Sequence, residues 1–131
     1  MRLKSLFCTL IMLITTLSIS AQNAIDKAVD EYSSIGKSTF TSAVERDPQT
    51  RKVLKVVKVL QPTDITINKL RKAFLNEQEN GQFSIMSNEQ EETMTLTVEN
   101  PKENRVYMMK YTNRGASFAN GKVTIIIRYK Q

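Results

Sequence analysis

The amino-acid sequence predicts an α+β fold, in which an antiparallel sheet of four to six strands packs two helices on one face. Apolar residues recur with helical spacing over residues 23–35 and 66–80, whereas the period changes to two from residue 82 onward. The segment Thr93–Glu99 (TMTLTVE) alternates strictly between polar and apolar side chains, which is typical of a sheet with one face in water. The predicted order is α-β-β-α-β-β-β-β, in a single domain over residues 22–131.

The first 21 residues have the layout of a secretory signal peptide. A short basic stretch at Met1–Lys4 precedes an apolar run at Leu6–Leu17, and small residues suit cleavage after Ala21. The apolar run is too short to span a bilayer comfortably, which takes about 20 residues. We therefore expect a signal peptide over residues 1–21 and export to the periplasm or the extracellular space. An uncleaved N-terminal anchor is the alternative.

The composition of the exported chain restricts its chemistry. The sequence has no histidine, and its only cysteine, Cys8, lies inside the apolar run, so cleavage leaves no thiol and no disulfide. This excludes cysteine–histidine zinc sites, thiol nucleophiles and every pairing of a nucleophile with histidine. Loss of Arg2 and Lys4 with the signal lowers the formal net charge from +6 to +4. That charge is ordinary for a small domain, and we expect no nucleic-acid partner.

Each element has its own sequence signature. Residues 23–35 repeat apolar side chains at helical spacing and end before Gly36, and residues 66–80 do the same and end before Gly81. Runs of β-branched and apolar residues, separated by Gly, Pro and Asn, indicate strands. The predicted strands are Lys37–Arg46, Arg51–Leu60, Gln82–Ser87, Thr93–Glu99, Arg105–Thr112 and Lys122–Lys130.

The stretch Arg51–Leu60 (RKVLKVVKVL) is compatible with a helix or a strand. On a helical wheel its four basic residues fall in one arc, so the period alone favours a basic amphipathic helix. Four valines, the proline-containing turns on both sides, and a partner strand before the Asp47–Thr50 turn favour a β-hairpin instead. We predict the hairpin, with Phe40 opposite Val57.

Two groups of residues are candidate binding elements. Basic residues of the hairpin could make weak contacts with an anionic membrane surface, although lysines on an edge strand commonly serve to prevent sheet-to-sheet aggregation. A face of the later strands would suit a protein or glycan partner if it were exposed, but its residue types favour a place in the core. The first group is Arg51, Lys52, Lys55 and Lys58, and the second is Arg105, Tyr107, Met109 and Tyr111.

Acidic residues are the main groups left for acid–base chemistry. Asp26 and Asp30 are one helical turn apart, and Glu89, Glu91 and Glu92 cluster in a turn. Both groups are expected in polar surroundings, where nothing shifts a carboxyl pKa. No glycine-rich phosphate loop is present. We therefore predict no catalytic residue, no metal ligand and no cofactor.

The segment STFTSAVERDPQTRKVLKVVKVL is the most distinctive part of the chain. Together with the signal-like start and the helix and strands that follow, it resembles short secreted Bacteroidetes-type proteins grouped as a domain of unknown function. The resemblance covers essentially the whole chain after the signal. It implies export, and it brings no activity and no catalytic residues.

These observations predict a small secreted or periplasmic domain that binds rather than catalyses. We expect a non-enzymatic binding or interaction protein of the cell envelope, whose partner is a protein or a glycan. The alternative is a domain that handles a small ligand or carbohydrate, with weak hydrolase chemistry based on carboxylates. That alternative requires a pocket with Asp or Glu side chains pointing in.

Overall fold

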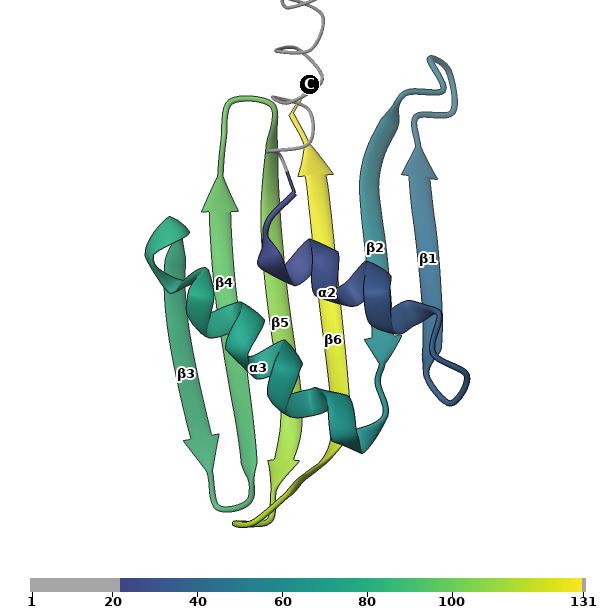
Figure 1. Cartoon of the computed structure of the whole chain (residues 1–131). Helices are drawn as coiled ribbons and strands as arrows, with labels where there is room; N and C mark the ends of the chain where they lie inside the picture. The colour runs from purple at the N-terminus through teal and green to yellow at the C-terminus, as the bar shows by residue number, and fades with distance from the viewer. Residues whose placement is uncertain (1–21, 131) are drawn as a thin grey trace, which may run out of the picture.

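The computed structural model describes residues 22–130 and contains one six-stranded antiparallel sheet with two helices on one face (Figure 1). The strand order is β1-β2-β6-β5-β4-β3, so β1 and β3 form the two edges. The predicted α+β class is confirmed, whereas the predicted signal peptide lies outside the described residues. The elements are α2 (Ala24–Ser33), β1 (Thr39–Arg46), β2 (Val53–Gln61), η1 (Asp64–Thr66), α3 (Ile67–Asn76), η2 (Gln78–Asn80), β3 (Gln82–Asn88), β4 (Glu91–Glu99), β5 (Glu103–Asn113) and β6 (Phe118–Tyr129).

Both helices begin close to the predicted positions, and α2 also ends close to its predicted end. Asn23 caps α2 through a capping box with Asp26, in which each side chain accepts a hydrogen bond from the other residue's backbone. The helix α3 is shorter than predicted because it stops at Asn76 and continues as the 3₁₀ turn η2. The apolar stripes of both helices pack onto the sheet and form the core with Leu60, Met94, Leu96, Val123 and Ile125.

The predicted hairpin is confirmed, but its register differs by three residues. Phe40 lies opposite Leu60 instead of Val57. The loop is longer than a four-residue turn because the backbone N–H of Asp47 donates to the Lys52 carbonyl, and Arg51 adopts a positive φ of 64°. A β-bulge at the end of β1 adds a further shift.

The topology corrects the interpretation of the hairpin lysines. The strand β2 is internal, between β1 and β6, so its lysines do not protect an edge. The true edge strand is β1, and its residues Thr39–Val44 carry no charge. Lys55 lies opposite Arg128, whereas Lys58 lies opposite the buried Ile125, so the two lysines point to different faces of the sheet.

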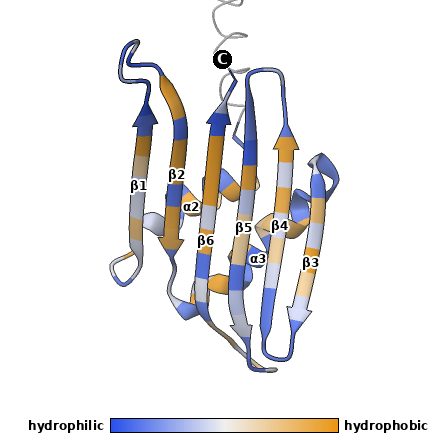
Figure 2. Cartoon of the chain, turned by 180° about the vertical axis from the view of Figure 1, so that it is seen from behind, coloured by the Kyte–Doolittle hydropathy of each residue, from blue (hydrophilic) through white to orange (hydrophobic). Residues whose placement is uncertain are grey.

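The face of the sheet away from the helices, called the open face here, has no element packed on it within residues 22–130 (Figure 2). Its side chains alternate along each strand with the core residues, and Thr93, Thr95 and Thr97 lie on it as the strict alternation of that segment predicts. No helix in the described part of the chain is long and apolar enough to cross a membrane. The apolar side chains near the middle of the open face are Val57, Val106, Met108 and Ile126.

Candidate functional site

The tyrosine and methionine side chains proposed as a partner-binding face belong to the core. Tyr107, Met109 and Tyr111 are each no more than 1% exposed beneath the helices. Burial therefore removes them as a binding surface and supports the alternative that they are core residues. The fourth member of the group, Arg105, is 16% exposed at its side chain and is held by two carboxylates.

Asp26 joins α2 to β5 through a buried polar network. Its carboxylate accepts hydrogen bonds from the Tyr107 hydroxyl at 3.0 Å and from Arg105 Nη1 at 3.2 Å. Glu103 accepts from Arg105 Nε at 2.6 Å. Burial raises the pKa of Tyr107, which therefore stays protonated and donates to Asp26. The expectation that Asp26 lies on a solvated helix face was wrong, because the residue is only 5% exposed.

A second polar network surrounds Tyr111 at the other end of β5. The Tyr111 hydroxyl donates to the Glu92 carboxylate and accepts from Arg71 Nε at 2.7 Å. Asn113 Nδ2 donates to the same carboxylate at 3.1 Å, and the Arg71 guanidinium lies 4.5 Å from the centre of the Phe118 ring. The hydrogen bond from Tyr111 holds the pKa of Glu92 below its usual range, and burial raises the pKa of Tyr111.

The lowered pKa of Glu92 makes part of the stability depend on pH. Because the folded pKa lies below the unfolded value, the stabilisation is present above the unfolded pKa and is lost as pH falls through the folded pKa. We expect Glu92→Gln to lower the free energy of unfolding at pH 7 and to have less effect at acidic pH below the folded pKa, where Glu92 itself is protonated. Urea unfolding of both proteins across this range measures the difference. A difference that stays constant with pH would contradict the assignment.

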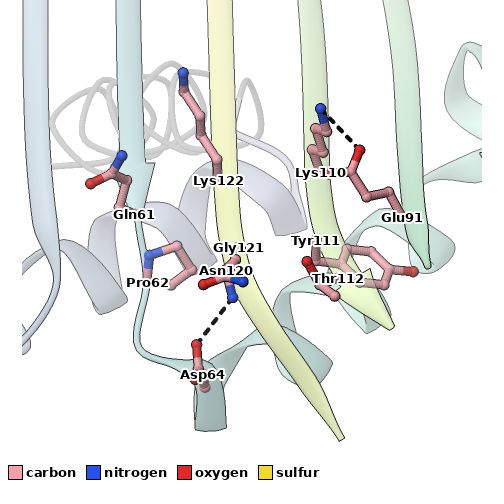
Figure 3. Close-up of a pocket in the computed structure, with 10 residues that line it drawn as sticks. All are labelled: Gln61, Pro62, Asp64, Glu91, Lys110, Tyr111, Thr112, Asn120, Gly121 and Lys122. Atoms are coloured by element: carbon pink, nitrogen blue, oxygen red, sulfur yellow. Dashed lines mark hydrogen bonds and ion pairs between the residues drawn. The ribbon is translucent and has the colours of Figure 1, made fainter. Parts of the chain in front are cut away.

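A groove lies at the end of the open face where β2 ends and β6 begins (Figure 3). Its volume is about 510 Å³, and its walls come from β2, η1, β4, β5 and β6. Asn120 adopts the left-handed conformation with φ of 55°, and its backbone N–H donates to Asp64 at 3.3 Å. The lining residues are Gln61, Pro62, Asp64, Glu91, Lys110, Tyr111, Thr112, Asn120, Gly121 and Lys122.

Gly121 allows this end of the sheet to lie against the connection from β2 to α3. A Cβ atom at this position would lie 2.9 Å from Cγ1 of Ile67 and 3.3 Å from Cγ of Pro62. The helix side of β6 is therefore closed over by Ile67 and Pro62, while the neighbouring Lys122 extends from the open face. The dipeptide Asn120-Gly121, visible in the sequence as a turn signal, thus positions one wall of the groove.

Two lysines stand directly opposite each other in the groove. Lys110 on β5 and Lys122 on β6 are cross-strand partners, and both side chains are exposed. Lys110 forms an ion pair with Glu91 at 3.1 Å, whereas Lys122 has no ion-pair partner among residues 22–130. Like charges directly opposite in a sheet destabilise it, and Glu91 offsets the charge of Lys110 only from the β4 side, so the contact with Lys122 is left without an anionic group.

A second hollow adjoins the groove on the open face. It has a volume of about 270 Å³ and shares both lysines with the first. Thr93, Thr124 and Met108 complete its lining. The lysine pair therefore stands between two depressions, an arrangement that fits an extended ligand better than a single small ion.

The groove contains chemistry that the sequence analysis did not identify. Lys110 and Lys122 were not singled out because they meet only through the pairing of β5 with β6, and Asp64 joins them only through η1 and its bond with the Asn120 backbone. Among residues 22–130, no group of three or more His, Cys, Asp or Glu side chains could hold a metal ion. The polar lining can bind hydroxyl, amide and anionic groups through hydrogen bonds and charge.

The basic residues proposed as an anionic-surface contact do not form one patch. Arg51 and Lys52 lie in the β1–β2 loop, at the end of the sheet opposite the groove (Figure 1). Lys55 and Lys58 point to different faces of β2. The four side chains therefore cannot contact one flat surface together.

The geometry of the site is the basis for assigning a function to this chain. No family model, no curated protein sequence and no solved structure matches it.

Proposed function

We propose that this protein is an exported, non-enzymatic binding domain of the cell envelope, which holds an acidic glycan across the Lys110–Lys122 pair. The observation that carries the proposal is the direct cross-strand opposition of these two lysines between two hollows of the open face. A carboxylate between them would turn a destabilising contact into a pair of charge-assisted hydrogen bonds. The signal-like N-terminus and the resemblance to short secreted proteins support export.

The rest of the lining favours a glycan as the ligand. Amide side chains of Gln61 and Asn120 and hydroxyl groups of Thr93, Thr112 and Thr124 surround the lysines. These groups donate and accept hydrogen bonds, as the hydroxyl groups of a sugar also do. Two adjoining hollows with a pair of lysines between them suit a polymer of sugar residues that carry carboxylates.

Binding of a polyuronate tests this proposal. We expect the purified protein to bind polygalacturonate in a calorimetric titration at low salt and to ignore neutral dextran. Replacement of both lysines, Lys110→Gln and Lys122→Gln, should weaken binding by about tenfold or more, equivalent to about 1.4 kcal/mol. Binding should also weaken as salt screens the exposed charges.

A charge-matched variant controls for the loss of two positive charges. Lys69 and Lys72 lie exposed on α3, on the other side of the sheet, so Lys69→Gln with Lys72→Gln should leave binding unchanged. Equal losses in both double variants would show a non-specific charge effect and would overturn the site. Equal binding of polyglutamate would overturn the proposal that the ligand is a glycan. Release of new reducing ends from the polymer would support the hydrolase alternative, since the carboxylates Asp64 and Glu91 line the groove.

The lysine pair also predicts a gain in stability on mutation. Because Lys122 faces Lys110 across the strands, Lys122→Gln removes a like-charge contact. We expect the free energy of unfolding in the absence of ligand to rise by up to about 0.5 kcal/mol. Chemical denaturation at low salt measures this change. A clear loss of stability would mean that Lys122 is a structural residue.

A further inference from the structure

The edge strand β3, and β1 over Thr39–Val44, lack the usual protection against strand addition. Within residues 22–130, β1 and β3 each pair with one neighbour only. The strand β3 (QFSIMSN) has no charge, no proline and no bulge, and its Ile85 and Met86 are 48% and 71% exposed. On β1, Thr39–Val44 is also uncharged, and Val44 is 50% exposed. Such edges present unpaired backbone N–H and C=O groups to another strand.

The charges beside the two edges are complementary. Exposed acidic residues lie at both ends of β3, with Glu79 before it and Glu89 after it. An exposed basic residue lies at each end of β1, with Lys37 before it and Arg46 at its end, where Glu45 and Asp47 flank Arg46. Among the described residues none of these four side chains takes part in an ion pair. Pairing of β3 with β3 would instead bring like charges together.

The direction of the strands suits the pairing of β1 with β3 of a second copy. All neighbouring strands are antiparallel, so β1 and β3 at opposite ends of a six-stranded sheet run in opposite directions (Figure 1). A copy displaced along the sheet therefore places its β1 antiparallel to β3 of its neighbour. Its helices remain on the same side of the extended sheet.

One register satisfies side chains and backbone together. Opposing Thr39–Glu45 with Gln82–Asn88 places Val44 against Phe83 and Ser42 against Ile85, and all four side chains lie on the helix side. The backbone N–H of Asp47 donates to the Lys52 carbonyl, in the direction of β2. Because backbone groups alternate in direction along a strand, the odd-numbered residues of β1 bond to β2 and the even-numbered residues direct their N–H and C=O groups outward. A two-residue loop joins Asn88 to Glu91, and the two residues that flank such a loop form hydrogen bonds with each other. The even-numbered residues of β3 therefore bond to β4, and the odd-numbered residues direct their backbone N–H and C=O groups outward.

We infer that copies of this protein assemble head to tail, with β1 of one copy adding to β3 of the next to form a continuous antiparallel sheet. In the register above, Lys37 lies beside Glu89 of the neighbour, and Arg46 lies near its Glu79. The interface joins two different edges, so it leaves a free edge at each end and propagates as a filament. Six strands spaced by about 4.8 Å give a rise of about 29 Å per copy. Strand twist of roughly 20–25° gives a rotation of about 120–150° per copy.

Charge exchange between the two edges tests this assembly. The first variant carries Lys37→Glu and Arg46→Glu, so both of its edges are acidic. The second carries Glu79→Lys and Glu89→Lys, so both of its edges are basic. We expect the wild-type protein at millimolar concentration and low salt to form chains in sedimentation velocity, and each variant alone to remain monomeric. An equimolar mixture of the two variants should assemble again, because every contact in a chain of alternating variants joins an acidic edge to a basic one.

Two further measurements separate this assembly from general aggregation. Electron microscopy of wild-type chains should show an axial rise near 29 Å per copy. Ile85→Lys should abolish chain growth while circular dichroism shows the folded spectrum, because a lysine then occupies the centre of the edge. Monomeric wild-type protein, assembly of either charge variant alone, or a mixture that stays monomeric would each overturn the inference. The outcome is independent of glycan binding, since the groove residues are unchanged.

Discussion

Replacement of Asp26 by alanine should lower the free energy of unfolding by about 3–5 kcal/mol, because it leaves the buried Tyr107 hydroxyl without its acceptor and Arg105 with one carboxylate instead of two. The Tyr107 hydroxyl and Arg105 Nη1 both lose the carboxylate that they contact, at 3.0 and 3.2 Å. The start of α2 also loses half of its capping box. Urea denaturation followed by circular dichroism at pH 7 measures the change.

Two matched variants show whether the loss comes from this network. Asp30 lies on the same helix but is exposed, so Asp30→Ala should change stability by no more than about 0.5 kcal/mol. Tyr107→Phe removes one hydroxyl and should cost about 1–2 kcal/mol, less than the loss of Asp26. Similar small effects for Asp26→Ala and Asp30→Ala would mean that the carboxylate contributes little to folding.

Asp26 also shows why part of the structure could not be predicted from the sequence. The helical period places it on the polar side of the helix, next to Asp30 and Glu31, and nothing nearby in the chain indicates a buried partner. Its partners, Arg105 and Tyr107, lie on β5, about 80 residues later. Local pattern identifies which residues form a helix, but it does not indicate which distant strand the helix covers.

The hairpin was likewise predictable from the sequence only in part. Valine content and the flanking turns correctly identify β2 as a strand. Its place between β1 and β6 depends on β6, the last strand of the chain, so the sequence alone suggested an edge. Because β2 is internal, its lysines do not protect an edge, and Lys55 and Lys58 point to opposite faces of the sheet. The edges are β3, which is uncharged, and β1, which is uncharged over Thr39–Val44, and their exposure motivates the proposed assembly.

The groove is a further product of long-range pairing. Lys110 and Lys122 are ordinary lysines in two separate strands when the sequence is read alone. They become a candidate site only because the β5–β6 register places them opposite each other, next to Asp64 and Glu91. Without histidine, and without a cysteine after the signal-like segment, the sequence left carboxylate, lysine or tyrosine chemistry as the catalytic options, and the structure supplied the location of a candidate site.

Replacement of Gly81 by alanine is expected to have the second large effect on stability. Gly81 is extended at the start of β3, so the substitution creates no backbone strain of its own. The added Cβ would overlap the backbone carbonyl oxygen of Thr97 and would lie 3.1 Å from Leu96 Cδ1. A backbone oxygen cannot rotate away as a flexible side chain does, so β3 must move from β4. We expect the free energy of unfolding to fall by about 3 kcal/mol, measured by urea denaturation.

Gly36 supplies the matched control for this substitution. A Cβ at Gly36 would meet nothing within 4 Å, so Gly36→Ala should leave the protein as stable as before or more stable by up to about 1 kcal/mol. Equal effects at both glycines would show that β3 adjusts freely and that the close approach to Thr97 is not required. A loss confined to Gly81 would show that this approach holds β3 in register on β4. Because the proposed assembly pairs β3 of one copy with β1 of the next, Gly81→Ala should then also prevent chain growth, whereas Gly36→Ala should not.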